Sequence, residues 1–335
     1  MPSALKVLVT DYVWPSLEPE RAVLAKAGIS LFAAPDAHEE TLASLAKDAD
    51  GILTCFAKVT GKVLEAAPKC KVVGRYGVGV DNIDVETATK LGIAVTYVPD
   101  YCVDEVSDHA MTLLLAWNRR IVLFDTSTKI TGWGRVALSM PIMRLRGKKL
   151  GVVGFGRIGR VTAFKAQAFG MEILAHDAVI PADQIAKHGA KPVDMSTLLR
   201  EADFVTLHVP LIQQTRGIIG KAQLAMMKPT AVLINTARGP LVDEAALVEA
   251  LKAKRIAGAA LDVLVDNNPP KDHPLLGFDN VLITPHVAFY SKEAVLELEE
   301  RAAREVVRVL QGQMPDNLYN SAVLPNTRVK LAKKG

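Results

Sequence analysis

The chain has 335 residues, of which 50% are hydrophobic and 23% charged, and its formal net charge is +4. This balance is typical of a globular protein long enough for two domains, and it excludes a disordered or low-complexity chain. The sequence contains neither an apolar run of about 18 residues nor a basic region followed by an apolar core, so it predicts no membrane span and no signal peptide. Three widely spaced cysteines, Cys55, Cys70 and Cys102, predict buried free thiols in a reducing, cytoplasmic compartment.

Short apolar runs alternate with helical patterns at the start of the chain. Strands are expected at 6–10, 30–33, 51–55 and 72–73, and helices at 18–27, 39–46 and 62–67. Such alternation predicts a parallel sheet with helices on both faces. A long helical pattern then runs from Asp104, a candidate N-cap, to Arg120. The mixed segment 126–146 reads as a connector over the surface.

A second alternating pattern follows this connector. Strands are expected at 150–153, 172–175, 204–208, 231–235, 257–261 and 281–284, with helices at 195–201, 221–226, 244–253 and 291–310. We therefore expect an α/β protein with two Rossmann-like or flavodoxin-like domains. Residues 104–289 would form a cofactor domain inserted into a discontinuous domain of residues 1–103 and 290–335. The basic end, with Arg328, Lys330, Lys333 and Lys334, reads as a solvated, disordered tail, and no nucleic-acid or membrane partner is expected.

The most specific motif is Gly154-x-Gly156-x-x-Gly159, which follows the strand at 150–153 and opens a helical pattern. The apolar residues of this pattern are Val161, Phe164 and Ala168. The glycine spacing permits a tight turn, close approach to a pyrophosphate, and close packing of helix on strand. Asp177 ends the next strand, where an acid accepts hydrogen bonds from a ribose 2′-hydroxyl and repels a 2′-phosphate. The motif therefore predicts NAD as cofactor.

Reactive side chains follow three of the later strands. Arg238, Asp262 and His286 each come directly after a strand, where ligands of parallel sheets bind. Arg238 is suited to a carboxylate and His286 to proton exchange with a hydroxyl. Without the glycine motif, the simpler interpretations would be that Arg238 forms a salt bridge and that His286 has a structural role. His208, beside Pro210, could line the cofactor, whereas His109 and the other histidines have no such setting, and no cluster has metal-ligand spacing.

Several segments together resemble the D-isomer-specific 2-hydroxyacid dehydrogenases over roughly residues 5 to 320. They are 74–84, 154–159, 235–244, 258–263 and 284–286. Within this family, 99–108 and 286–291 resemble the C-terminal-binding-protein branch and its bacterial relatives.

The resemblance implies a role for each matching position. Arg238 would bind the substrate carboxylate and carbonyl, His286 would be the acid/base, and Asp262 would contact the nicotinamide carboxamide. The implied substrate-binding residues are Arg75, the backbone amides of Val78 and Gly79, and Phe289, where a tryptophan is usual. The implied cofactor contacts are Gly154, Gly156, Arg157, Ile158, Gly159, Asp177, His208, Val209, Pro210, Thr215, Thr236, Ala237, Arg238, Asp262 and His286.

The chain departs from the family at one position. Asn267 stands where the family has the glutamate that pairs with the catalytic histidine, and residues 262–270 contain no glutamate. An amide can orient an imidazole but does not stabilise its charged form, so His286 should titrate lower. Three interpretations stay open: a reductase with weakened acid catalysis, Asp266 turning inward as a substitute, or an unusual substrate or binding role.

The sequence therefore predicts an NAD-dependent oxidoreductase that interconverts a small D-2-hydroxy acid and its 2-oxo acid. The alternative is an NAD(H)-responsive scaffold of C-terminal-binding-protein type with little turnover. The residues leave the particular acid open. The family also implies a homodimer, built through the cofactor domain, the helix at 104–120 and the 126–146 segment.

Overall fold

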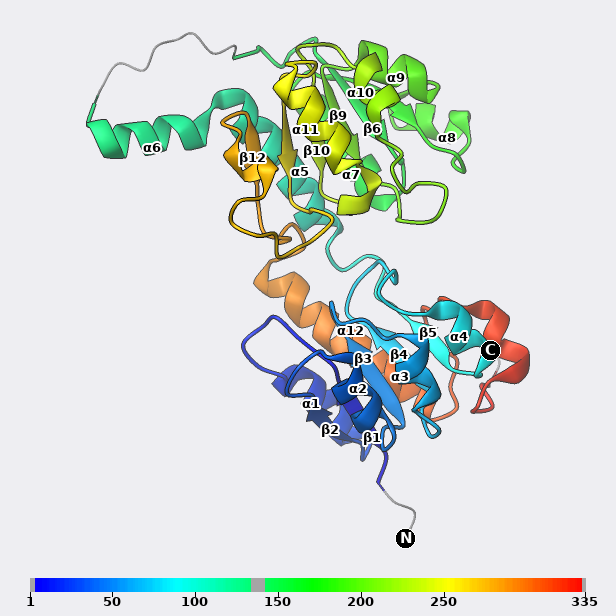
Figure 1. Ribbon diagram of the computed structural model, residues 1–335. Helices are drawn as coiled ribbons and strands as arrows, with labels where there is room; N and C mark the ends of the chain where they lie inside the picture. Colours follow the sequence, from blue (N-terminus) through cyan, green and yellow to red (C-terminus); the bar gives the residue numbers. More distant parts are fainter. Residues whose placement is uncertain (1–3, 134–141, 333–335) are drawn as a thin grey trace. The chain divides into compact units, whose positions relative to one another are not determined.

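The computed structural model describes residues 4–133 and 142–332 (Figure 1). The chain divides into two compact units, unit 1 with residues 1–101 and 291–335 and unit 2 with residues 102–290. Each unit contains one parallel sheet, so the predicted α/β class with two parallel-sheet domains is confirmed. No helix in the described part of the chain is both long and apolar enough to cross a membrane.

Unit 1 is built on a five-stranded parallel sheet of order β2-β1-β3-β4-β5. Its strands are β1 Lys6–Val9, β2 Ser30–Ala33, β3 Gly51–Thr54, β4 Val72–Arg75 and β5 Ala94–Thr96. Val7 at the centre pairs with Leu31 on one side and Gly51 on the other. This strand order is that of flavodoxin-like folds, which bind ligands beyond the carboxyl ends of the strands.

Helices cover both faces of this sheet (Figure 1). α1 Glu18–Lys26 and α12 Lys292–Leu310 pack together on one face, and α2 Glu39–Ala46, α3 Gly61–Glu65 and α4 Val85–Lys90 share an apolar core with the other. α12 comes so close to β4 that a Cβ added to Gly74 would lie 2.7 Å from the Val306 side chain. The far end of the chain therefore completes this unit.

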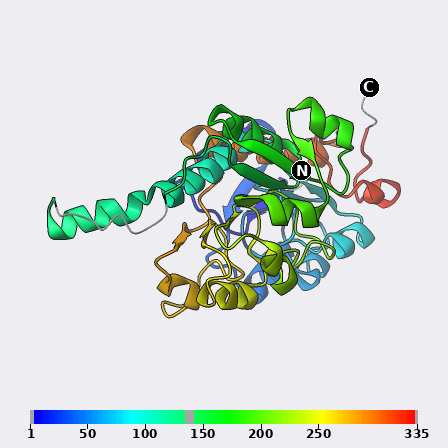
Figure 2. The same ribbon diagram turned by 90° about the horizontal axis from the view of Figure 1, so that it is seen from above.

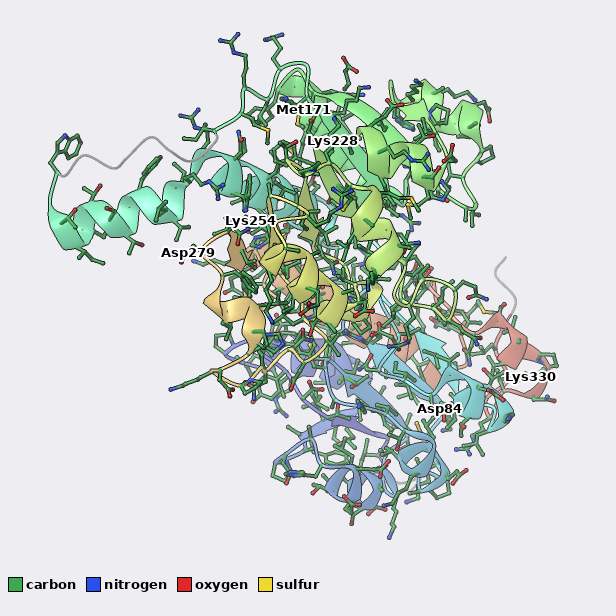
Figure 3. All side chains as sticks on the ribbon, turned by 45° about the horizontal axis from the view of Figure 1, so that its top comes forward. Asp84, Met171, Lys228, Lys254, Asp279 and Lys330 are labelled. Atoms are coloured by element: carbon green, nitrogen blue, oxygen red, sulfur yellow. The ribbon has the colours of Figure 1, made fainter. Side chains whose placement is uncertain are left out.

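Two elements of unit 1 were not predicted from the sequence. α4 is short and rich in threonine, and it begins where the Asp84 side chain, labelled in Figure 3, accepts a 2.9 Å hydrogen bond from the Thr87 amide. β5 is three residues long, and its Val95 amide donates to the side chain of Asn320, which is 225 positions away. Both depend on capping or on distant partners more than on an apolar pattern.

The prediction of a disordered basic tail is wrong for the residues up to Ala332. The Arg328 guanidinium donates hydrogen bonds of 2.7 to 2.9 Å to the carbonyls of Leu91, Ala67 and Cys70. The Ala332 amide donates to the carbonyl of Gly312. Lys333 and Lys334 lie outside the described residues. This segment is anchored because its arginine satisfies buried carbonyls that no helix or strand pairs.

Unit 2 contains a seven-stranded parallel sheet of order β12-β11-β10-β9-β6-β7-β8. Its strands are β6 Lys149–Val153, β7 Glu172–His176, β8 Lys191–Pro192, β9 Phe204–Leu207, β10 Val232–Asn235, β11 Gly258–Leu261 and β12 Val281–Ile283. The strand order reverses between β6 and β9, which is the switch point where dinucleotides bind in Rossmann folds.

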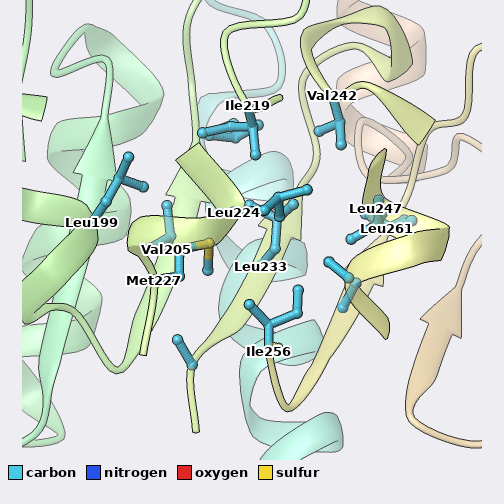
Figure 4. Close-up of a cluster of buried hydrophobic side chains, with 14 of the residues drawn as sticks. Leu199, Val205, Ile219, Leu224, Met227, Leu233, Val242, Leu247, Ile256 and Leu261 are labelled. Atoms are coloured by element: carbon cyan, nitrogen blue, oxygen red, sulfur yellow. The ribbon is translucent and has the colours of Figure 1, made fainter. Parts of the chain in front are cut away.

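Helices lie on both faces of this second sheet. α5 Val103–Arg119 and α7 Arg157–Ala168 pack together on one face. α9 Met195–Glu201, α10 Lys221–Met226 and α11 Glu244–Lys252 enclose the apolar cluster of the other face (Figure 4). α8 Ala182–Lys187 and β8 are short and were not predicted.

Two details of the predicted helices are corrected. α5 begins at Val103 with Cys102 as its N-cap, so Asp104 is not the cap. Asp104 lies in the first turn, where its negative charge interacts favourably with the helix dipole. α7 forms as predicted, but its buried residues are Gly159, Thr162, Ala163 and Ala166. Phe164, part of the apolar pattern, is instead 71% exposed.

The predicted connector at 126–146 is also corrected. α6 Ile121–Thr131 takes up its first part, and no residue of this helix is buried. Residues 134–141 lie outside the described residues. Arg120 separates α5 from α6 with a left-handed φ of 56°, and both views show α6 projecting beyond the end of α5 (Figures 1 and 2).

Candidate active site

The glycine motif forms the loop between β6 and α7. Gly154 has a φ of +92°, and a Cβ on it would lie 2.7 Å from the His208 backbone after β9. A Cβ on Gly159 would lie 2.1 Å from the Gly154 carbonyl oxygen. Gly156, in contrast, has nothing within 4 Å of such an atom. Two glycines are therefore required by packing, while the third borders open space at the start of a helix, where a pyrophosphate fits.

Asp177 follows β7 and holds the neighbouring loop. Its carboxylate accepts hydrogen bonds from the amides of Phe155, Val179 and Ile180, at 2.7 to 2.9 Å. Burial acts to raise the pKa of Asp177, but these amides outweigh it and the pKa is lowered. Because Oδ2 accepts from one amide while Oδ1 accepts from two, one acceptor position remains on Oδ2 for a ribose hydroxyl. Asp177 also lines a hollow with Ile180, Val193 and others.

The other predicted cofactor residues of this edge lie close to the same switch point. Arg157 and Ile158 open α7, so their amides are among the unpaired donors of the first turn. Thr215 closes a turn by donating its hydroxyl to the Pro210 carbonyl at 2.6 Å and accepting from the Ile212 amide. His208 and Val209 precede this turn. Burial lowers the pKa of His208 to about 4, so this imidazole is neutral at physiological pH.

Arg238 is presented by a loop that Asn235 holds at the end of β10. The buried Asn235 side chain donates to the Arg238 carbonyl at 2.8 Å and accepts from the Ala237 amide at 3.0 Å. The Arg238 guanidinium donates to the Ala237 carbonyl at 2.8 Å. Thr236, in the same loop, is buried. These contacts fix the arginine backbone beside the switch point.

His286 has an unusual backbone conformation. Its φ is 55°, in the left-handed region that side chains other than glycine rarely adopt. The His286 amide donates to the Asp262 carbonyl at 2.8 Å. The Asp262 carboxylate accepts from the Val287 amide at 3.0 Å and from the Ala288 amide at 2.9 Å. A buried carboxylate therefore imposes a costly conformation on the imidazole loop, a situation that is concentrated at functional sites.

His109 lies next to Asp262, a contact that the sequence did not predict. On α5, its Nε2 atom is 2.9 Å from Thr284 Oγ1 and 3.4 Å from Asp262 Oδ1. No sequence pattern could have found this contact, because it joins a helix to a strand end 175 residues later.

Phe289 and Asn267 differ in how the structure places them. The Phe289 ring packs edge-to-face on the His286 imidazole, with centroids 6.3 Å apart. Asn267 is exposed on the loop after β11. Asp266, also exposed, accepts from the Asn268 amide at 2.9 Å. That either residue takes the place of the family's glutamate stays a prediction.

The predicted substrate residues of unit 1 follow β4. Arg75 is 6% exposed; its Nε donates to Asn82 Oδ1 at 3.0 Å and its Nη1 to the Tyr76 carbonyl. Val78 is 38% exposed, and Gly79 is partly buried. In residues 4–133 and 142–332, no group of three or more His, Cys, Asp or Glu side chains is arranged to hold a metal ion.

Residues 111–288 match the model of the D-isomer-specific 2-hydroxyacid dehydrogenase NAD-binding domain. The chain belongs to the D-isomer-specific 2-hydroxyacid dehydrogenase family. It is 42% identical to the glyoxylate reductase of Thermococcus litoralis over 84% of this chain and 86% of that protein. It is 43% identical to the D-3-phosphoglycerate dehydrogenase of Methanocaldococcus jannaschii over 97% of this chain, but it spans only 61% of that protein.

Solved structures of the family have the same fold. The D-lactate dehydrogenase of Aquifex aeolicus, in complex with NAD and lactic acid, matches with a TM-score of 0.84 and 29% identity, over 91% of this chain and 96% of that one. The family match, with the open Gly156 position and Asp177, supports a nicotinamide dinucleotide, NAD(P), as cofactor.

Proposed function

We propose that this member of the family reduces a small 2-oxo acid to its D-2-hydroxy acid with NADH. The observation that carries the proposal is the His286 loop, whose left-handed backbone is held by the buried Asp262. Arg238 follows β10, two strands from β12 in the same parallel sheet. An imidazole, an arginine and a glycine cradle at one edge of a sheet are what this reaction needs.

In the proposed reaction the bound nicotinamide supplies the hydride that reaches C2 of the oxo acid. Arg238 binds the substrate carboxylate with two parallel hydrogen bonds and polarises the 2-oxo group. His286 gives its proton to the 2-oxo oxygen, which becomes the hydroxyl. The family resemblance assigns Arg75 and the backbone amides of Val78 and Gly79 to substrate binding, and it assigns Phe289 to the lining of the substrate pocket. Asn267 or Asp266 would orient the imidazole in place of a glutamate.

We expect NAD(H) to be preferred over NADP(H). Asp177 has a lowered pKa and is therefore anionic, so it would repel a 2′-phosphate while accepting from a 2′-hydroxyl. Replacing Asp177 by Ser would remove this charge. The expected result is a rise of the NADH dissociation constant and a fall of the NADPH constant, measured by nucleotide fluorescence; a variant with unchanged selectivity would contradict this role.

The substrate class rests on named relatives. Glyoxylate reductase and D-lactate dehydrogenase are matched over most of their length, and both names denote chemistry on short 2-oxo or 2-hydroxy acids. We therefore expect glyoxylate, hydroxypyruvate or pyruvate to be reduced. The scaffold alternative is not favoured, because these relatives are named as dehydrogenases and reductases.

We also propose that the protein forms a homodimer. Ile130 on α6 is 77% exposed, Trp133 is 97% exposed and Phe164 on α7 is 71% exposed. Apolar side chains exposed to this degree favour a second copy of the chain as their partner. Light scattering on an Ile130→Asp, Trp133→Asp double variant would test this, since it should release monomers. Cys55, Cys70 and Cys102 are buried thiols rather than disulfides, which supports a reducing compartment, and we expect the cytoplasm.

The deciding experiment is NADH oxidation by the purified protein with a panel of 2-oxo acids across pH. We expect turnover that increases toward low pH, because Asn267 stands at the position of the family's glutamate and His286 must be protonated to act. Arg238→Lys serves as the paired variant: it keeps the charge but loses bidentate binding, so KM for the oxo acid should rise strongly. Tight NADH binding without any turnover would overturn the proposal.

A further inference from the structure

A three-residue cluster lies at the carboxyl ends of β11 and β12, and the proposed reaction does not use all of it. His109 Nε2 is 2.9 Å from Thr284 Oγ1 and 3.4 Å from Asp262 Oδ1. The Thr284 hydroxyl donates to Asp262 Oδ1 at 2.6 Å. The Asp262 side chain is 0% exposed and that of His109 is 20% exposed. The imidazole is therefore coupled to a fully buried carboxylate, both directly and through a hydroxyl.

The direction of these hydrogen bonds fixes one proton of His109. A threonine hydroxyl has a single hydrogen, which Thr284 uses on Asp262, so Thr284 Oγ1 must accept from His109. Nε2 therefore carries hydrogen whatever the charge of the ring. Uptake or loss of a proton then takes place at Nδ1, and it changes the charge beside Asp262 without breaking the Nε2 contact.

Asp262 keeps capacity for one more donor. Oδ1 accepts from Thr284 and the Val287 amide and lies near His109, whereas Oδ2 accepts from the Ala288 amide. A carboxylate has about four acceptor positions, so one remains on Oδ2. Burial acts to raise the pKa of Asp262, but the hydrogen bonds from His109, Thr284, Val287 and Ala288 outweigh it and the pKa is lowered. The group is anionic at neutral pH.

We propose that His109 is a positioning residue that tunes the charge at Asp262 and so sets the relative affinity for oxidised and reduced nicotinamide dinucleotide. The inference rests on the proposed function, because it takes Asp262 to face the nicotinamide. The oxidised ring is cationic and the reduced ring is neutral. A neutral His109 leaves the Asp262 charge uncompensated, which favours the oxidised form. A protonated His109 compensates that charge and removes the preference.

Because the binding of nucleotide and the binding of a proton are thermodynamically linked, this preference predicts proton release on nucleotide binding. If protonation of His109 weakens NAD⁺ binding, then NAD⁺ binding must in turn release a proton from His109. NADH, whose ring is neutral, should release far less. Between about pH 5.5 and 8 we expect the release of about 0.3–0.5 proton per NAD⁺ bound and a change of up to about tenfold in the NAD⁺-to-NADH affinity ratio.

α5 and the elements packed against it carry other charged groups. On α5 itself these are Glu105, one turn earlier, and Asp108, which pairs with Lys165 of α7 at 2.7 Å. The remaining groups are Arg238 after β10, Asp262 after β11, His286 after β12 and Arg120 at the junction with α6. His286 is the other imidazole at this edge of the sheet, so the test must separate it from His109.

The experiment measures proton release on nucleotide binding by calorimetry of the full-length protein in buffers of different ionisation enthalpy. His109→Gln keeps an N–H donor but cannot titrate, and His109→Leu removes both properties. His273→Gln is the matched control, because His273 is 18% exposed and its Nε2 lies 3.5 Å from a carboxylate, that of Glu244. Wild type and the control should release protons with NAD⁺, and His109→Gln should not.

Each outcome decides the inference. A pH-independent affinity ratio in His109→Gln, with weaker binding of both nucleotides in His109→Leu, would support it. Proton release that persists in His109→Gln would assign the proton to His286 and overturn it, while turnover of an oxo acid by the wild type would leave the proposed function standing. A wild type that binds neither nucleotide would overturn both proposals.

Discussion

In each of the two units, one aspartate and one asparagine bond to the backbone of loops beside the sheet, but the loops they hold carry different residues. In unit 1, Asp11 after β1 accepts from the amides of Cys55 and Phe56, and Asn82 donates to the carbonyls of Cys55 and Ala57. In unit 2 the two residues hold different loops: Asp262 accepts from the Val287 and Ala288 amides after β12, and Asn235 donates to the Arg238 carbonyl and accepts from the Ala237 amide after β10.

The difference lies in what the fixed loops carry. Among the described residues of these loops, only one residue with a left-handed backbone can transfer protons, His286 in the loop that Asp262 holds. The same sheet also presents a glycine, Gly156, with open space where a side chain would be. An Asp and an Asn bonded to a loop backbone therefore indicate a fixed loop, whereas chemistry requires a strained reactive residue and an opening in addition.

The largest effect that would sharpen this comparison is expected at His286. Replacing His286 by Gln should lower kcat for oxo-acid reduction about 10²–10⁴-fold, because the group that donates the proton is lost. NADH binding, followed by fluorescence, should change little. The matched variant His273→Gln should keep its turnover, and a His286→Gln protein as active as wild type would remove the imidazole from the mechanism.

Two alanine substitutions within the glycine motif should separate folding from binding. Gly159→Ala places a Cβ 2.1 Å from the Gly154 carbonyl, so we expect a loss of about 3 kcal/mol in the free energy of unfolding. Gly156→Ala meets no atom within 4 Å and should unfold like wild type, yet its NADH dissociation constant should rise more than about tenfold, since a methyl group would occupy the pyrophosphate's approach. Equal effects on unfolding would refute this distinction.

The two loop-holding asparagines offer a direct comparison of the sheets. Asn235→Ala and Asn82→Ala each remove two hydrogen bonds to a loop backbone, and each should cost about 1–3 kcal/mol of stability. Asn82→Ala in addition removes the acceptor of Arg75 Nε. Asn235→Ala should also reduce kcat/KM about tenfold, because Arg238 loses its fixed backbone. NADH affinity should be unchanged in Asn82→Ala; a shift there would show that the unit 1 loop affects the cofactor.

A smaller effect is expected from a buried pair of acids in unit 1. Glu20 and Glu299 are both buried, and Trp14 donates to Glu20 Oε1 at 3.2 Å. Burial and the charge of Glu20 raise the pKa of Glu299 to about 8. Since the folded state favours the protonated acid, this stabilisation is complete below about pH 4.5, the ordinary value, and is lost as the pH rises toward 8.

Thermal unfolding at several pH values checks this expectation. The Tm of the wild type should fall by a few degrees between about pH 6 and 9. Glu299→Gln should flatten this dependence, whereas Glu300→Gln, the adjacent and more exposed carboxylate, should retain it. A wild-type Tm that rises over this range would contradict the assignment.

The sequence predicted those features that depend on local patterns. Apolar runs identified the longer strands, and the glycine spacing identified the loop after β6 together with Asp177. Elements that depend on distant partners were not predicted. One is β5, whose Val95 amide donates to the Asn320 side chain. The contact of His109 with Thr284 was not predicted for the same reason, because it forms only when α5 packs against the sheet.

Asn118 has a consequence for how this protein could be re-engineered. Its side chain donates to the Met143 carbonyl at 2.9 Å and accepts from the Met143 amide at 3.0 Å. Both polar atoms of this side chain near the end of α5 are thus tied to the backbone of a single residue, Met143. α6, Ile121–Thr131, begins shortly after Asn118 and buries none of its residues. Substitutions in α6 should therefore leave intact the sheet that holds Arg238 and His286.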